Sequence, residues 1–108
     1  MKDKPNYYAV LIAEVRYDHD LGNFSKLLYA EISALCNKEG YCWAGNSYFA
    51  NLYGVSKNSI SSWINNLRDA GHISVQMNYK EGTKHILNRY IKLLAEGTPE
   101  NLGTYPNN

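Results

Sequence analysis

Residues 56–66 form a cluster of small hydrogen-bonding side chains. The polar residues that remain when the apolar positions are set aside are Ser56, Lys57, Asn58, Ser59, Ser61, Ser62, Asn65 and Asn66. Asparagine can bond to adenine through two hydrogen bonds, lysine can reach guanine, and serine can donate to phosphates or base edges. If a helix begins here, its free backbone N–H groups also suit a phosphate. All of these residues except Asn66 are predicted to contact DNA.

A second group of candidate residues lies in the basic segment 72–93. This segment holds four basic residues and one acidic residue, although the whole chain has a net charge of only +1. Lys80, Lys84 and Arg89, with His85 as a further candidate, are expected to lie near a DNA backbone or minor groove. The alternative is an ordinary solvated hairpin. Because cations are few, one copy is expected to bind weakly. Useful affinity then requires self-association, a tandem site or a tethered oligomerisation domain.

The elements that must position these groups follow from hydrophobic spacing and from helix-ending residues. A helix is expected over 23–37, with one apolar face at helical spacing. That face comprises Phe24, Leu27, Leu28, Ile32 and Leu35. Gly40 supplies the stop. Residues 7–12 form an apolar run that predicts either a strand or an extended arm, and Asp18, His19 and Asp20 predict a polar turn.

Two shorter helices are expected next. Asn46 is predicted to cap a helix over 47–53 that Gly54 ends, and Ser56 to cap a helix over 57–70 that Gly71 closes. Two helices that cross steeply need a small residue at their contact and a turn that tolerates a left-handed backbone. Ala50 and Gly54 meet these needs. The apolar residues expected to close the junction are Phe49, Tyr53, Val55, Ile60 and Trp63.

The remainder predicts a hairpin and a tail. Residues 72–78 alternate, with Ile73, Val75 and Met77 on one side, a turn follows at 79–83, and a second strand is expected over 84–93. The register of that strand stays open, because Ile86 and Tyr90 are out of phase with Leu87 and Ile91. The predicted organisation is an N-terminal arm and loop over 1–22, a DNA-binding domain over 23–94 and a flexible tail or linker over 95–108. The expected fold class is mainly α with a small β-hairpin (α+β), a winged helix-turn-helix.

Other chemistry is not favoured. Cys36 and Cys42 lack the companion ligands of a zinc site and are expected to be buried thiols in a reducing, cytoplasmic setting. The sequence contains no catalytic or nucleotide-binding motif, so no cofactor and no metal are expected and the protein is predicted not to be an enzyme. No segment has the apolar length of a membrane span.

The tyrosines could stack unpaired bases, but Tyr29, Tyr48 and Tyr53 fall beside core positions, so packing is the expected role.

A family resemblance adds detail. The segments 7–18, 25–35, 40–44, 48–57, 62–67 and 71–73 resemble the amino-terminal winged-helix domain of phage and plasmid replication initiation proteins from Gram-positive bacteria. These are replisome organisers, often joined to a DnaD-like carboxy-terminal domain. The resemblance covers about residues 7–93. It implies origin recognition on double-stranded DNA and recruitment of helicase-loading machinery through a carboxy-terminal domain missing from this sequence.

Three functions are therefore open. The leading hypothesis is a non-enzymatic double-stranded DNA-binding domain in replication initiation. A small transcriptional regulator would use the same module. A winged helix that serves only protein–protein interaction or oligomerisation would leave the polar helix face without a DNA role.

Overall fold

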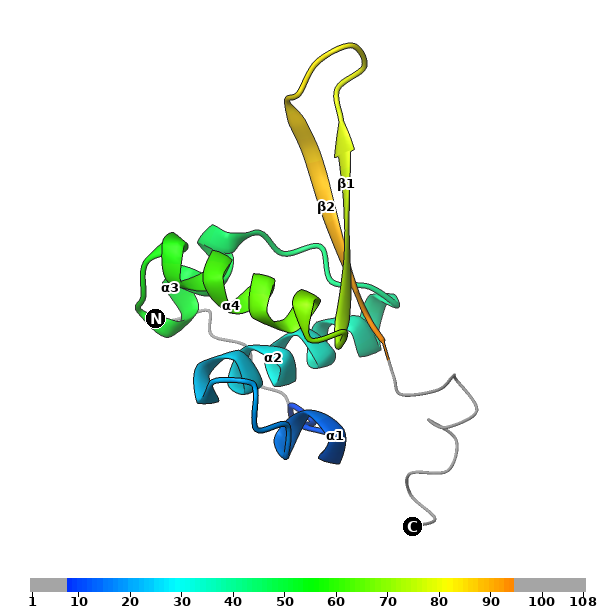
Figure 1. The fold of residues 1–108 in the computed structure, drawn as a ribbon. Coiled ribbons are helices and arrows are strands. Elements are labelled where there is room, and N and C mark those ends of the chain that lie inside the picture. The colour runs from blue at the N-terminus through cyan, green and yellow to red at the C-terminus, as the bar shows by residue number, and fades with distance from the viewer. Residues whose placement is uncertain (1–7, 95–108) are drawn as a thin grey trace.

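The structure, a computed structural model, describes residues 8–94. Its elements are α1 (Ala13–Arg16), α2 (Asn23–Glu39), α3 (Asn46–Tyr53), α4 (Lys57–Asp69), β1 (Ile73–Tyr79) and β2 (Ile86–Leu93). The helices pack together, and the hairpin of β1 and β2 projects away from them (Figure 1). The core lies where α2, α3, α4 and the base of the hairpin meet, and its largest buried side chains include Tyr29, Phe49, Leu28 and Ile60. The predicted tail at 95–108 and Tyr7 lie outside the described residues.

The segment before α2 differs from its prediction. Residues 8–12 form neither strand nor helix, although Ile12 is extended, and Leu11 and Ile12 pack on the core as an arm would. The Ser33 hydroxyl of α2 donates to the carbonyl of Val10 at 3.0 Å. The short helix α1 was not expected from the sequence. It follows directly and buries Val15 completely.

Helix α2 begins where predicted and runs two residues further, and Gly40 ends it with a left-handed φ of 84°. The predicted apolar face is partly wrong. Leu28 and Ile32 are buried, but Phe24 is 61% exposed and Leu27 is 48% exposed. The buried stripe is rotated by about one residue, because α2 is covered by the N-terminal arm on one side and by α4 on the other. Ser25, Leu28, Tyr29, Ile32, Ser33 and Cys36 form this stripe.

The junction of α3 and α4 has the predicted form. Ala50 is buried, Gly54 has a φ of 69°, and the N–H of Val55 donates to the Ala50 carbonyl at 3.0 Å. The turn requires glycine at position 54 because residues with a side chain rarely adopt a positive φ. The Tyr53 hydroxyl donates to Glu31 at 2.9 Å, which ties α3 to α2. Burial raises the pKa of Tyr53, so the phenol stays protonated as a donor.

The hairpin is antiparallel, with Ile73 opposite Leu93, Val75 opposite Ile91 and Asn78 opposite Asn88. Tyr79 then pairs with Ile86, so Leu87 is an extra residue in β2. The bulge shifts the alternation of β2, so that Ile86 lies on the same face as Ile91 although the two are five positions apart. On the other side of β2, Ile91 exchanges two backbone hydrogen bonds with Cys42, at 2.7 and 2.8 Å.

Candidate nucleic-acid interface

Helix α4 begins at a side-chain cap. The N–H of Ser59 donates to the Ser56 Oγ at 3.1 Å, and that hydroxyl donates in turn to the Ser59 Oγ at 3.1 Å. Ser56 therefore satisfies one of the free N–H groups at the helix start, as the sequence predicts. The two serine hydroxyls are therefore partly occupied by hydrogen bonds to each other, and the cap orders the first turn of α4.

The faces of α4 separate cleanly. Ile60, Ile64 and Leu67 are buried against the body. The predicted contact residues on the helix lie away from this stripe: Lys57, Asn58, Ser62 and Asn65 are exposed, and Ser59 and Ser61 are half-buried. The Asn66 amide, which was left out of the predicted set, lies 3.5 Å from the Ser25 hydroxyl of α2. The structure thus leaves four of the predicted side chains exposed on α4, whereas Ser59 and Ser61 border its buried stripe on opposite sides.

The other two free cations of the predicted site lie at the tip of the hairpin. Lys80 and Lys84 are exposed there, on either side of a turn closed by the Lys80 N–H, which donates to the His85 carbonyl at 2.8 Å. The Thr83 hydroxyl donates to the Lys80 carbonyl at 2.9 Å and accepts from the His85 N–H at 3.1 Å. These bonds order the turn and leave both ammonium groups in solvent. The tip lies well away from α4 (Figure 1).

Arg89 does not belong with those lysines. Its guanidinium is half-buried and donates to the Asn46 Oδ1 at 2.7 Å and to the Ala44 carbonyl at 2.8 Å. Burial lowers the pKa of Arg89 from its usual value, and its Nε has no hydrogen-bond partner. The arginine ties β2 to the start of α3. The side chain predicted to face DNA is therefore occupied within the fold.

The same bond corrects the prediction for Asn46. Gly45 is the residue at the N-cap of α3, and no side chain caps that helix. The Asn46 amide oxygen, expected at the helix N–H groups, instead accepts from Arg89. The sequence spacing could not separate the two roles because the competing donor lies 43 residues away.

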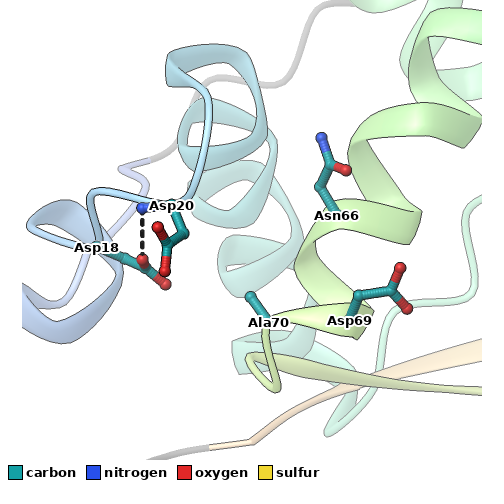
Figure 2. Close-up of a pocket in the computed structure, with 5 residues that line it drawn as sticks. All are labelled: Asp18, Asp20, Asn66, Asp69 and Ala70. Carbon is teal, nitrogen blue, oxygen red and sulfur yellow. Dashed lines mark hydrogen bonds between the residues drawn. The ribbon is translucent and has the colours of Figure 1, made fainter.

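An acidic hollow limits the interface at the other end of α4. A cavity of about 340 Å³ is lined by Asp18, Asp20, Asn66, Asp69 and Ala70. Figure 2 shows Asp18 and Asp20 in the loop on one side of this space and Asn66, Asp69 and Ala70 on the other, with the Asp69 carboxylate directed away from the loop. Carboxylates repel phosphates, so an anionic ligand is favoured at the amino-terminal half of α4 and disfavoured at its carboxy-terminal end.

The acidic loop itself is a turn, as predicted. The N–H of Asp20 donates to the Asp18 Oδ1 at 2.9 Å (Figure 2). The other Asp18 oxygen lies 2.7 Å from Nε2 of the buried His72. Because the imidazole donates to the carboxylate, this bond lowers the pKa of Asp18. The pairing with His72 joins the loop to the residue before β1. Spacing in the sequence does not reveal this pairing because the two residues are 54 positions apart.

The two cysteines are buried free thiols, as expected. Burial raises the pKa of Cys36 to about 11 and also raises the pKa of Cys42. The Cys36 thiol contacts the Ile91 carbonyl at 3.6 Å. Within residues 8–94, no three potential metal ligands come together.

Comparison with known proteins supports the assignment of the central unit. Residues 21–73 match a family described as a helix-turn-helix domain. The match extends from just before α2 to the first residue of β1, and so spans α2, α3 and α4. No curated protein matches the chain. Within the described part of the chain, no helix has both the length and the apolar character needed to cross a bilayer. With its antiparallel hairpin directly after this match, the chain has the α+β fold of a winged helix-turn-helix.

Proposed function

We propose that this chain is a non-enzymatic, double-stranded DNA-binding domain that acts in the initiation of phage or plasmid replication. The observation that carries the DNA-binding part is the division of α4. Its buried stripe holds the helix on the body, while Lys57, Asn58, Ser62 and Asn65 stand in solvent with no carboxylate among them. The replication role rests on the sequence resemblance stated above.

In the proposed complex the amino-terminal half of α4 lies in the major groove. Lys57, Asn58, Ser61, Ser62 and Asn65 contact base edges there, and Ser56 and Ser59 lie at the helix start beside a phosphate. Lys80 and Lys84 contact the backbone from the hairpin tip. Arg89 supports this contact indirectly, because it holds β2 against the start of α3.

A titration of duplex DNA at two salt concentrations tests the proposal. With four to six phosphate contacts, affinity should fall by about tenfold or more between about 50 and 200 mM salt. Replacing Lys57 and Asn58 with alanine should weaken binding by about tenfold or more, because the pair supplies one cation and one base-reading amide. The melting temperature should stay unchanged, since both side chains are exposed.

The matched control replaces Lys92 and Asn37 with alanine. This pair also removes one lysine and one amide, and both side chains are exposed, on β2 and near the end of α2. It should retain DNA affinity. Equal affinity of both double variants and the parent would remove this face of α4 from DNA binding. An affinity that does not respond to salt would favour the protein-interaction alternative.

A small transcriptional regulator would share every one of these contacts. The two roles are separated by where the protein binds. Footprinting on the DNA of the encoding element should protect its replication origin, whereas protection confined to a promoter would favour the regulator. Recruitment of helicase-loading machinery is proposed only for a carboxy-terminal domain beyond this sequence.

A further inference from the structure

The outer edge of β1 presents unpaired backbone groups. The N–H of Leu94 donates to the His72 carbonyl at 2.9 Å, so residues 72 and 94 form a hydrogen-bonded pair. Such pairs alternate along an antiparallel ladder. Ser74, Gln76 and Asn78 therefore bond to β2, and Val75, Met77 and Tyr79 direct their N–H and C=O groups away from it. The hairpin projects from the body, so this edge is open (Figure 1).

The same edge lacks the features that usually prevent strands from pairing between molecules. Natural edge strands carry lysine, proline or a bulge for this purpose. The β1 sequence, Ile-Ser-Val-Gln-Met-Asn-Tyr, contains no charged residue and no proline. The charges and the bulge of this hairpin are in β2, which holds Arg89, Lys92 and the extra residue Leu87.

The side chains along this edge are self-complementary. Val75, Met77 and Tyr79 share one face, where Met77 is 39% exposed and Tyr79 is 51% exposed, with the tyrosine hydroxyl 3.8 Å from the methionine sulfur. Gln76 and Asn78 share the other face. In an antiparallel pairing centred on Met77, each Val75 meets a Tyr79, the two Met77 side chains meet each other, and each Gln76 meets an Asn78. Apolar side chains then face apolar ones, and amides face amides.

We propose that two copies of this chain associate through the outer edges of their β1 strands, antiparallel about a two-fold axis at Met77. Each pair of outward-facing residues can exchange two backbone hydrogen bonds, and the two hairpins become one four-stranded sheet. No like charges meet across the axis, because β1 has none. Lys80 and Lys84 lie beyond the paired segment, in the turn, and remain in solvent.

This inference does not depend on DNA binding, but it supplies the second copy that a weakly basic domain needs. A single strand edge is a small interface, so the free dimer should dissociate at a concentration on the order of 10–100 µM. A two-fold dimer would present two α4 helices and would favour a duplex with two inverted half-sites.

Sedimentation of the isolated protein tests the surface. The parent should form a concentration-dependent dimer, and Met77→Lys should raise its dissociation constant by about tenfold, because two ammonium groups then meet across the axis. Leu87→Lys is the matched control. It adds the same charge to the same hairpin at an exposed position of β2, and it should dimerise like the parent. Circular dichroism establishes that each variant is folded.

A cysteine at the axis tests the register. The residues of a hydrogen-bonded antiparallel pair have Cα atoms about 5.5 Å apart, within the range that a disulfide spans. Met77→Cys should therefore give a covalent dimer under mild oxidation, much faster than Leu87→Cys, while the buried Cys36 and Cys42 stay reduced. This experiment keeps the proposal testable even if Met77→Lys does not fold.

Three results would overturn the proposal: a parent that stays monomeric at the highest concentration, a dimer unaffected by Met77→Lys, or equal crosslinking of the two cysteine variants. None of them bears on the proposed function, since they are measured without DNA. Conversely, a dimer that fails to bind duplex DNA would leave the β1 contact standing and overturn the proposed function alone.

Discussion

The α3–α4 junction and the outer half of the hairpin both contain apolar side chains, but they use them in opposite ways. At the junction, Phe49, Ala50 and Ile60 are buried. In the outer hairpin, Met77, Tyr79, Ile86 and Leu87 are exposed. Apolar surface stabilises a fold only when it leaves water, whereas exposed apolar surface stabilises a complex when a partner covers it. The first region therefore maintains the fold, and the second is available for binding.

The largest expected effect separates these two regions directly. Ile60→Ala should cost about 2–5 kcal/mol of unfolding free energy, since it removes a fully buried side chain and leaves a cavity. Leu87→Ala, at a 58% exposed position, should cost less than about 0.5 kcal/mol. Urea denaturation followed by circular dichroism measures both. Comparable losses of unfolding free energy in the two variants would contradict this division between a junction that stabilises the fold and an outer hairpin that does not.

A smaller effect is expected where the two regions are joined. Arg89→Met should cost about 1–3 kcal/mol, because the Asn46 and Ala44 oxygens lose their donors. Its signature should be local: hydrogen exchange should accelerate in the hairpin and at the start of α3, with the centre of α4 unchanged. Lys92→Met, at an exposed position of the same strand, is the control and should leave exchange unaltered. Uniform acceleration along the chain would mean that Arg89 contributes only to global stability.

The smallest effect should be a pH dependence of the melting temperature that comes from the Asp18–His72 bond in the helical body. The hydrogen bond from His72 lowers the pKa of Asp18 below its ordinary value of 3.8. A lowered folded-state pKa stabilises the protein above the unfolded-state pKa, and this contribution is lost as the pH falls through the folded-state pKa. The melting temperature of the parent should therefore drop between about pH 5 and pH 2, and Asp18→Asn should show a shallower drop.

Asp20→Asn, in the same loop, is the control for this measurement. Its carboxylate is exposed, so its removal should leave the slope of melting temperature against pH close to that of the parent. A slope that is the same in Asp18→Asn and the parent would show that the bond to His72 contributes nothing to acid sensitivity.

The predictions that held depend on local chemistry. Ser56 caps α4, Gly54 turns the chain between α3 and α4, and Gly40 ends α2, because each requires only its neighbours in sequence. The polar face of α4 was predictable for the same reason: helical spacing alone separates Ile60, Ile64 and Leu67 from Asn58, Ser62 and Asn65.

Most of the predictions that failed depend on partners distant in sequence. Phe24, at the start of α2, was expected in the core. Its ring instead stacks on Trp63 of α4 with the ring centroids 5.2 Å apart, and it stays exposed. Helical spacing defines a stripe to within about one residue, and only the neighbouring elements decide which part of it is covered. The four-residue α1 has too short a pattern to be distinguished from an extended arm.

The sequence by itself determined the order of the elements from α2 to β2, the turns between them and the composition of the polar helix face, because these follow from conformational preferences over a few residues. Only the tertiary structure decided that Arg89 is bonded to Asn46 and Ala44, that Asp18 bonds to His72, and that the extra residue Leu87 lies in β2 and not in β1. Each of these depends on which groups meet across the fold. A hydrogen-bonding side chain takes whichever partner the packing brings within reach.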